Sequence, residues 1–206
     1  KLTFLMTGQN LNYEAAKPVG AEAPVLLEVC SLSKKENFKD VSFSLHSGEI
    51  IGITGLLGSG RTELALALFG LNPPDSGETR IDGKKVSIRS VRDALRQGIA
   101  YVPENRLTQG LVLHQSVGKN IVVTVIRRML KGLGFIDTPR VRSEMEKWIK
   151  ELAIKVPTPD AAIETLSGGN QQRVVLAKWM ATEPKVLVRD GPTVGIDVAA
   201  KSSIHG

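Results

Sequence analysis

The chain of 206 residues carries a formal net charge of +6, with 42% hydrophobic and 23% charged residues, a composition ordinary for a soluble globular protein. No apolar run in the sequence approaches the ~18 residues that a membrane-spanning helix needs, and the first residues do not resemble a secretory signal peptide. The single cysteine, Cys30, excludes an internal disulfide and fits a reducing compartment.

The first part of the chain predicts a connector followed by short strands. Residues 1–24 are expected to be a tail and a linker, because the stretch before residue 25 is rich in proline, glycine and alanine. Strands are predicted over residues 25–30 and 41–45, the second from its alternation of apolar and polar side chains. A third, apolar strand is predicted over residues 50–54.

A glycine-rich loop follows this third strand and leads into a helix predicted over residues 63–69. The order strand, loop and helix is that of a P-loop, and the template G-x-x-x-x-G-K-[ST] is met except that Arg61 replaces lysine. Such a loop curls its backbone N–H groups around phosphate oxygens, and Thr62 is placed to bring a hydroxyl to Mg²⁺. The candidate phosphate ligands are Gly55, Gly58, Ser59, Gly60, Arg61 and Thr62. An ordinary glycine-rich turn is the alternative.

Beyond the P-loop, strand and helix signals alternate. A hairpin is predicted with strands at 79–81 and 86–88 around the turn pair Asp82-Gly83. Further predicted elements are helices over 91–97, 116–130 and 140–154, a helix ending near residue 180, and strands over 99–102 and 186–188. This alternation favours an α/β fold with a largely parallel sheet, interrupted by a helical insertion around residues 104–167. Met145 and Trp148 are predicted to be core residues of that insertion.

The positive charge is concentrated in one segment. Residues 119–150 hold eight basic and three acidic side chains. A solvated helix face is the default interpretation, and a nucleic acid or a membrane-side partner could also use such a segment.

Three motifs together resemble the ATPases of ABC transporters. The run Leu-Ser-Gly-Gly-Asn-Gln-Gln-Arg at residues 166–173 resembles their signature motif, and it is joined by the P-loop and by an apolar strand that ends in Asp190. The match is narrowed to one group of these ATPases by three further features: Asn170, the run from Tyr101 to Arg106, and the run Gly-Ile-Asp-Val at 195–198. They resemble the second nucleotide-binding domain of tandem ATPases that drive monosaccharide importers, the ribose, galactose, xylose and autoinducer group.

The resemblance implies a fold and a domain order. The fold would be an α/β P-loop NTPase (RecA-like) core with an antiparallel β subdomain and a helical ABC subdomain. Residues 1–24 would be the tail of a preceding domain and a linker, 25–103 the core with the β subdomain, 104–167 the helical subdomain, and 168–206 the return to the core. In the family a further helix, a strand and a switch histidine follow, and His205 comes too early to be that histidine. The C-terminal part of the core is therefore expected to be missing, and the chain to be a fragment.

The resemblance also implies an ATP site shared between two domains. Each site would combine the P-loop of one domain with the signature of the other, and the signature residues meeting ATP in trans would be Ser167, Gly168, Gly169 and Gln171. Thr62 and Asp190, with Glu104 as a further candidate, would hold Mg²⁺, and Asp197 would lie in the D-loop that contacts the partner. Implied partners are a second nucleotide-binding domain, integral membrane permease subunits and, indirectly, a sugar-binding protein, with no nucleic acid expected. The location would be peripheral, on the cytoplasmic face of the cell membrane.

Several positions depart from the family pattern, and most affect this domain's own half-site. Arg61 replaces the P-loop lysine, Glu104 replaces the usual glutamine, and no aromatic ring lies near Lys34 to stack on adenine. Gly191 stands where a glutamate polarises the attacking water, so general-base help worth about 10²–10⁴-fold is absent. Arg189, in a strand expected to be buried, has no explanation.

The sequence is compatible with three functions. The first is the ATP-binding domain of the energy-coupling subunit of an ABC sugar importer, with this half-site degenerate. The second is a non-hydrolysing module that supplies only its signature motif to a partner domain. The third is a soluble ABC ATPase acting on nucleic acid or ribosomes, which would need aromatic stacking residues among the basic ones.

Overall fold

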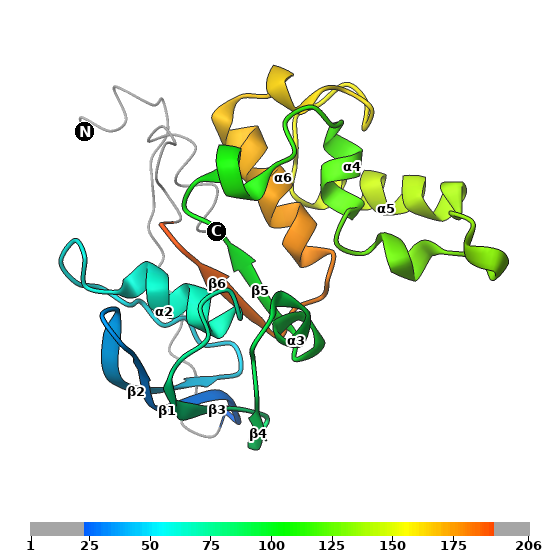
Figure 1. Cartoon of the computed structure of the whole chain (residues 1–206). Coiled ribbons are helices and arrows are strands. Elements are labelled where there is room, and N and C mark those ends of the chain that lie inside the picture. Colours follow the sequence, from blue (N-terminus) through cyan, green and yellow to red (C-terminus); the bar gives the residue numbers. More distant parts are fainter. Residues whose placement is uncertain (1–22, 192–206) are drawn as a thin grey trace. The chain divides into compact units, whose positions relative to one another are not determined.

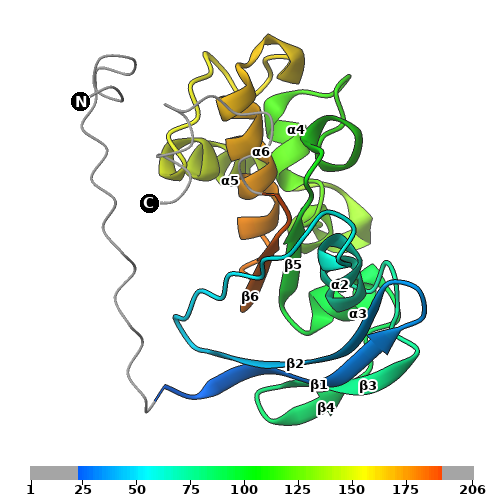
Figure 2. The same ribbon diagram turned by 90° about the vertical axis from the view of Figure 1, so that its left-hand side faces the viewer.

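The computed structural model describes residues 23–191 (Figures 1 and 2). These residues form two compact units, each described here by itself. The sheet unit contains residues 23–101 and 184–190, and the helical unit contains residues 102–183 together with Gly191. Among the described residues no helix has both the length and the apolar character needed to cross a bilayer. The domain boundaries given above remain a prediction.

A four-stranded antiparallel sheet is the base of the sheet unit. Its order is β2-β1-β3-β4, and its strands are β1 Val25–Lys34, β2 Phe38–His46, β3 Ser76–Ile81 and β4 Lys84–Val86. Asp82 and Gly83 close the β3–β4 hairpin with φ values of 50° and 72°, the left-handed pair that a two-residue type I′ turn requires. The first two predicted strands are confirmed, and so is the hairpin around Asp82-Gly83, although its second strand lies at Lys84–Val86 and not over 86–88.

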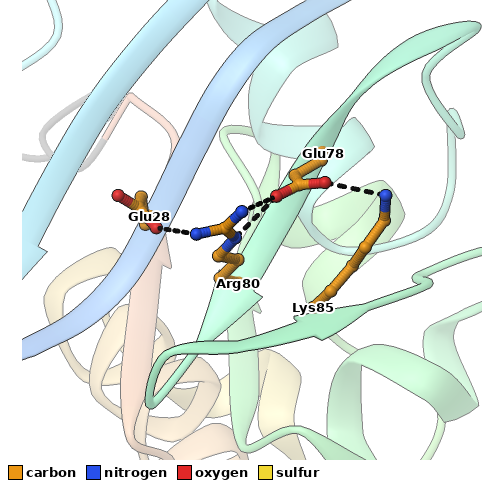
Figure 3. A network of polar contacts seen from close by, with 4 residues as sticks. All are labelled: Glu28, Glu78, Arg80 and Lys85. Atoms are coloured by element: carbon orange, nitrogen blue, oxygen red, sulfur yellow. Dashed lines mark hydrogen bonds and ion pairs between the residues drawn. The ribbon is translucent and has the colours of Figure 1, made fainter.

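The two faces of this sheet differ because side chains alternate along each strand. One face buries Leu27, Val29 and Ile81, and both views place the helices α2 (Arg61–Leu68) and α3 (Val91–Arg96) over it. Part of the opposite face carries the polar network of Figure 3. There Arg80 contacts Glu78 at 2.5 Å and Glu28 at 3.5 Å, and Lys85 contacts Glu78 at 2.7 Å. The hydrogen bonds from Lys85 and then Arg80 lower the pKa of Glu78.

A second, two-stranded sheet pairs segments that are far apart in the sequence. Its strands are β5 Ile99–Val102 and β6 Val186–Arg189. The backbone N–H groups of Lys185 and Val186 both donate to the Gly98 carbonyl, at 2.7 and 3.0 Å. The chain therefore enters both strands at the same end, and they run parallel. Both strands were predicted, and both are confirmed.

The strand predicted over residues 50–54 is wrong. These residues have no regular secondary structure, and the side chains of Ile50 and Ile53 are 81% and 49% exposed. An isolated extended segment needs a hydrogen-bonding neighbour to become a strand, and none of the described strands pairs with this one. A short apolar run is therefore not a sufficient signal for a strand here.

The helical unit is built from α4 (Val117–Val122), α5 (Thr138–Glu151) and α6 (Gly168–Met180). Short turns connect them: η1 Arg106–Gly110, η2 Ile126–Met129, η3 Gly132–Gly134 and η4 Ile163–Thr165. Fully buried side chains, including Ile121, Ile163 and Val174, fill its core together with Met145 and Trp148, as predicted. An added Cβ at Gly118 would lie 2.5 Å from the Met145 sulfur, so this glycine permits the close contact of α4 with α5.

The helix predicted over residues 116–130 is only partly correct. α4 ends at Val122, and the N–H of Val125 then bonds the Val122 carbonyl in a tighter turn. The four consecutive β-branched residues at 122–125 have a low helix propensity. The Thr124 hydroxyl also donates to the Lys178 carbonyl at 2.8 Å, so a tertiary contact holds this turn against α6.

Candidate functional site

The P-loop adopts a conformation that only glycine permits at its last position. Gly60 has φ +83°, and an added Cβ there would lie 2.2 Å from the Asn37 carbonyl oxygen. Earlier in the loop, an added Cβ at Gly55 would lie 2.5 Å from the Ser59 hydroxyl oxygen, and the Ser59 N–H bonds the Leu56 carbonyl at 3.1 Å. The loop therefore curls tightly between residues 55 and 60, and its end packs against the turn between β1 and β2.

Helix α2 begins directly after this loop without a side-chain cap. Gly60 is the N-cap residue, and the first helical hydrogen bond runs from the Leu64 N–H to the Gly60 carbonyl at 2.9 Å. The N–H groups of the first turn are thus left for an external acceptor, and the helix dipole favours an anion there. Arg61 is exposed and Thr62 half-buried at this end, whereas Glu63 adds one negative charge to the same turn.

The predicted Mg²⁺ ligand Asp190 lies just past the end of β6, in the same unit as the P-loop. Its Oδ2 accepts a hydrogen bond from the Tyr101 hydroxyl at 3.2 Å. The Tyr101 ring stacks on Phe69, the C-cap residue of α2, with 5.4 Å between ring centroids. This contact chain joins the P-loop helix to the carboxylate, and sequence reasoning did not single out either aromatic residue for it.

The predicted metal ligands do not form a metal cluster on their own. Thr62 and Asp190 belong to the sheet unit, and Glu104 is exposed in the helical unit. Within residues 23–191 no group of three or more His, Cys, Asp or Glu side chains is arranged to hold a metal ion. Mg²⁺ commonly uses one or two protein ligands plus substrate phosphates and water, so this sparse set fits an ion that arrives with a nucleotide.

The signature motif presents an exposed serine at the start of α6. Ser167 is the N-cap residue and makes no side-chain cap bond, and its hydroxyl oxygen accepts a hydrogen bond from the Asn170 amide at 3.0 Å. The amide oxygen of Asn170 in turn accepts from the Lys155 backbone N–H at 2.9 Å. The backbone at Gly168 and Gly169 therefore opens a 13-residue helix next to an oriented hydroxyl, an arrangement suited to an anion.

Gln171 lies behind this motif rather than on its surface. Its side chain is buried, its amide nitrogen donates to the Ile163 carbonyl at 3.4 Å, and its amide oxygen accepts from Arg106 at 3.3 Å. Lys178, about two turns further along α6, donates to the Gly110 carbonyl at 2.6 Å. Burial lowers the pKa of Lys178 to about 8. Two polar contacts thus join the turn after Glu104 to the signature helix.

Asn120 and Lys178 are positions that the sequence analysis missed. Asn120 is 2% exposed, and its side chain accepts from the Val112 N–H at 2.8 Å and donates to the Ser116 carbonyl at 3.0 Å. It therefore fixes the loop that leads into α4. The available signal was a polar residue inside an apolar helical run, which a folded protein tolerates only where the residue is hydrogen-bonded.

The structure describes the surroundings of three positions that depart from the family pattern. The position where an aromatic ring was expected carries an ion pair, with the Lys34 ammonium 3.1 Å from Asp75. The Lys35 N–H, followed by Lys34, lowers the pKa of Asp75. Gly191 has φ +51°, a left-handed conformation that side chains rarely adopt. Arg189 is half-buried, and burial lowers its pKa; nothing in the structure explains the choice of arginine.

Asp197, the run 195–198 and His205 lie outside the described residues. The P-loop and Asp190 fall in the sheet unit, and the signature and Glu104 fall in the helical unit. His114 is a surface residue, with a side chain 93% exposed and 3.6 Å from Glu164. His46 pairs with Glu49 at 3.0 Å in the sheet unit.

With the P-loop, the signature helix and the Asp190 strand in place, comparison with known proteins decides the family. A family model described as ABC transporter matches residues 38–194, which is more than half of the chain. This chain belongs to the ABC transporter family.

Curated relatives of this ABC transporter chain are import ATP-binding proteins. One described as a putative ribose/galactose/methyl galactoside import ATP-binding protein, from Pseudomonas syringae, is 46% identical over 207 residues and aligns with 99% of this chain but 39% of its own length. The ribose import ATP-binding protein RbsA of Bacillus licheniformis is 44% identical over 200 residues, covering 97% of this chain and 40% of that protein. The chain thus spans about two fifths of the length of these relatives.

Solved structures confirm the fold. The cbiO1 protein of Clostridium perfringens, part of an ABC transporter complex, matches with a TM-score of 0.72 at 24% identity, covering 88% of this chain and 71% of that one. A nucleotide-free ATP-binding cassette from an ABC transporter matches with a TM-score of 0.71 at 21% identity, covering 87% and 74%. The ABC ATPase fold predicted from the sequence is therefore confirmed.

Proposed function

We propose that this chain is the second nucleotide-binding domain of the energy-coupling ATPase of an ABC importer for monosaccharides. Membership of the ABC transporter family supports nucleotide binding, and the names of the relatives, ribose and galactose import ATP-binding proteins, support a sugar as cargo. In this role the chain works with a second nucleotide-binding domain, with membrane permease subunits and indirectly with a sugar-binding protein. Its place is peripheral, on the cytoplasmic face of the membrane.

The observation that carries the proposal is the start of α6. Ser167 is exposed there, its hydroxyl is oriented by Asn170, and the first-turn backbone at Gly168 and Gly169 opens the helix. In the proposed role this surface caps the terminal phosphate of a nucleotide that a partner domain holds. Gln171 is then a positioning residue, because its amide is hydrogen-bonded inside the helical unit.

The domain's own P-loop keeps the features needed to hold a phosphate. The uncapped first turn of α2, the exposed Arg61 and the glycine curl before it fit a nucleotide phosphate. Thr62 and Asp190 are the residues that would hold Mg²⁺. ATP, when bound, supplies the phosphoanhydride bond whose hydrolysis drives transport. Residues Gly55, Gly58, Ser59 and Gly60 would surround its phosphates.

ATP hydrolysis is the step that this half-site is least equipped to perform. Gly191 has no side chain that could accept a proton from water, so the site lacks general-base help. This specific observation favours a second candidate function, a module that binds nucleotide without turnover and mainly supplies its signature to the partner. Both candidates use the same surface at Ser167.

A thermal melt of the 206-residue chain with and without Mg-ATP tests the proposal. Binding to the folded state alone raises the midpoint, with about 2.7 kcal/mol of stabilisation at 100 times the dissociation constant. The shift should shrink in Arg61→Ala, which loses the P-loop cation, and persist in Ser167→Arg, which alters only the signature surface. A cooperative melt without any shift would contradict nucleotide binding by this P-loop and leave the signature-only module.

A further inference from the structure

The connection between α4 and α5 places apolar side chains in solvent. We define the apolar hairpin as residues 130–136, in which Leu133 is 97% exposed, Phe135 70% and Ile136 55%. In Figure 1 this connection turns back into α5 at the end of that helix away from α6. Apolar side chains gathered in this way on one protruding segment indicate an interaction surface rather than a part of the core.

The hairpin is fixed by its own backbone. Leu130 and Ile136 form an antiparallel bridge, the Lys131 N–H bonds the Phe135 carbonyl at 2.7 Å, and the Asp137 N–H bonds the Met129 carbonyl at 2.8 Å. The Met129 side chain is buried and anchors the base. Leu133, at the tip, has φ +64°, a conformation that leucine adopts rarely. The fold therefore holds these apolar side chains outward.

Basic residues flank the hairpin. Between Ile126 and Arg140 the sequence has four basic side chains and one acidic one, Asp137. Asp137 pairs with Lys131 at 3.2 Å, and its side chain is 23% exposed, whereas the Lys131 side chain is 57% exposed. Arg127 and Arg140 are exposed as well. A water-facing apolar tip with cations beside it is complementary to an anionic lipid surface, which offers negative headgroups above an apolar layer.

We propose that the apolar hairpin contacts an anionic membrane surface, inserting Leu133 and Phe135 at the headgroup boundary while Arg127, Lys131 and Arg140 meet lipid phosphates. This contact goes beyond the proposed function, because a permease alone could hold a transport ATPase at the membrane. It gives the helical unit a second, lipid-based attachment. Its chemistry is independent of the P-loop and of the signature.

Vesicle co-sedimentation with the full 206-residue chain tests this proposal. The probes are vesicles of phosphatidylcholine alone and of equal parts phosphatidylcholine and phosphatidylglycerol. The chain should sediment with the anionic vesicles and remain in solution with the neutral ones. Added salt should weaken the binding, because the Debye length falls to about 3 Å at 1 M ionic strength. Absence of binding to anionic vesicles overturns the proposal.

Two double variants separate the contribution of the hairpin's apolar side chains to vesicle binding from non-specific hydrophobic adsorption. Leu133→Ser combined with Phe135→Ser should reduce partitioning roughly tenfold or more, since each removes a large exposed apolar group. The matched control is Leu56→Ser with Leu57→Ser, because these side chains are 85% and 98% exposed in the sheet unit. The control should bind vesicles like the parent chain. Equal binding by the hairpin variant, or equal loss in the control, overturns the proposal.

A second pair of variants tests the charges. Arg127→Gln with Lys131→Gln should weaken binding to anionic vesicles by roughly fivefold per residue, about 1 kcal/mol each. The matched control, Lys35→Gln with Lys39→Gln, removes two exposed lysines from the sheet unit and should have no comparable effect. Binding only to vesicles that contain reconstituted permease, and dependence of that binding on Leu133 and Phe135, would identify a protein partner and overturn the lipid assignment.

The two proposals fail separately. The Mg-ATP thermal shift reports on the P-loop, and the hairpin variants should leave it unchanged. A chain that binds anionic vesicles without responding to Mg-ATP would contradict the nucleotide proposal alone. A chain with the thermal shift and no vesicle binding would contradict the membrane proposal alone.

Discussion

Tyr101 donates a hydrogen bond to Asp190 at 3.2 Å while its ring stacks on Phe69 at the end of the P-loop helix. Tyr101 is 5% exposed and Phe69 2% exposed, so both rings belong to the core of the sheet unit. The Asp190 carboxylate, which is expected to bind Mg²⁺, is therefore held by the buried Tyr101, and the Tyr101 ring in turn packs against the end of α2. This relationship makes the phenol a positioning residue with a measurable role.

Tyr101→Phe should remove this hydrogen bond and keep the ring stack. We expect the free energy of unfolding to fall by about 1 kcal/mol, the usual net worth of such a bond. We also expect the ATP-induced thermal shift to depend less on Mg²⁺, because Asp190 is no longer oriented. Phe69→Leu is the control, since it weakens the stack and leaves the hydrogen bond. A Tyr101→Phe variant with an unchanged Mg²⁺ dependence would exclude the positioning role.

The buried ammonium of Lys178 predicts a pH-dependent stability. Its pKa is about 8 in the folded chain, against an ordinary value of 10.5, so the unfolded chain binds more protons between these pH values. The free energy of unfolding should therefore rise with pH from about 8 to 10.5, by on the order of 3 kcal/mol from this group. Urea unfolding at a series of pH values measures the slope.

The control for this slope is Lys178→Met. Methionine fills similar space without a charge, so the variant should lose the part of the pH dependence that comes from Lys178 and leave the contributions of exposed groups. In this variant the Gly110 carbonyl loses the ammonium that donates to it at 2.6 Å. This loss offsets part of the stability gained by removing a buried charge. Identical slopes in the two proteins would refute the assignment.

Gly60→Ala should be much more damaging than Gly58→Ala. Both positions have positive φ, which costs an ordinary residue roughly 1–2 kcal/mol. At Gly58 an added Cβ meets nothing within 4 Å, whereas at Gly60 it would meet the Asn37 carbonyl at 2.2 Å. We expect urea unfolding to show a loss of about 1 kcal/mol for Gly58→Ala and several for Gly60→Ala. Equal losses would mean that the loop relaxes away from Asn37.

Gly191→Glu tests whether a missing general base limits hydrolysis. The left-handed backbone at this position strains any side chain, so Gly191→Gln is the matched control, with the same strain and no base. If the base is the limiting defect, ATP hydrolysis should rise in the glutamate variant and not in the glutamine one. No rise in either, with both variants folded, would place the defect elsewhere, for example at Arg61.

Local sequence signals predicted much of the fold because they coincide with tertiary contacts here. The Asp82-Gly83 turn, the apolar alternation of β2 and the helical spacing of Met145 and Trp148 each match what the structure needs. The strand predicted over 50–54 is wrong, because a strand needs a hydrogen-bonded neighbour and an apolar run describes only one of the two segments. The helix predicted over 116–130 is only partly correct, because α4 ends at Val122 and a tighter turn follows at Val125.

Sequence motifs predicted which residues belong to the candidate site, but they did not predict which other residues these contact. Spacing indicated the P-loop, since phosphate binding needs a fixed order of glycines and a helix start. Ser167 and Asp190 were indicated by the resemblance of their motifs to those of ABC ATPases. The roles of Tyr101, Asn120 and Lys178 depend on residues far away in the sequence, and no local pattern encodes such partners. Gln171 illustrates the limit: the motif assigned it to a nucleotide held in trans, which stays a prediction, and its burial against Arg106 and Ile163 follows from packing.

The exposed run before the P-loop has a consequence for how the chain behaves in solution. Residues 50–54 pair with no strand among residues 23–191, and Ile50 and Ile53 are exposed, so their amide protons should exchange with deuterium far faster than those of β1. The same amides are a template for pairing between copies, and self-association at high protein concentration should protect them. Hydrogen exchange at two protein concentrations would therefore report assembly through this segment, residue by residue.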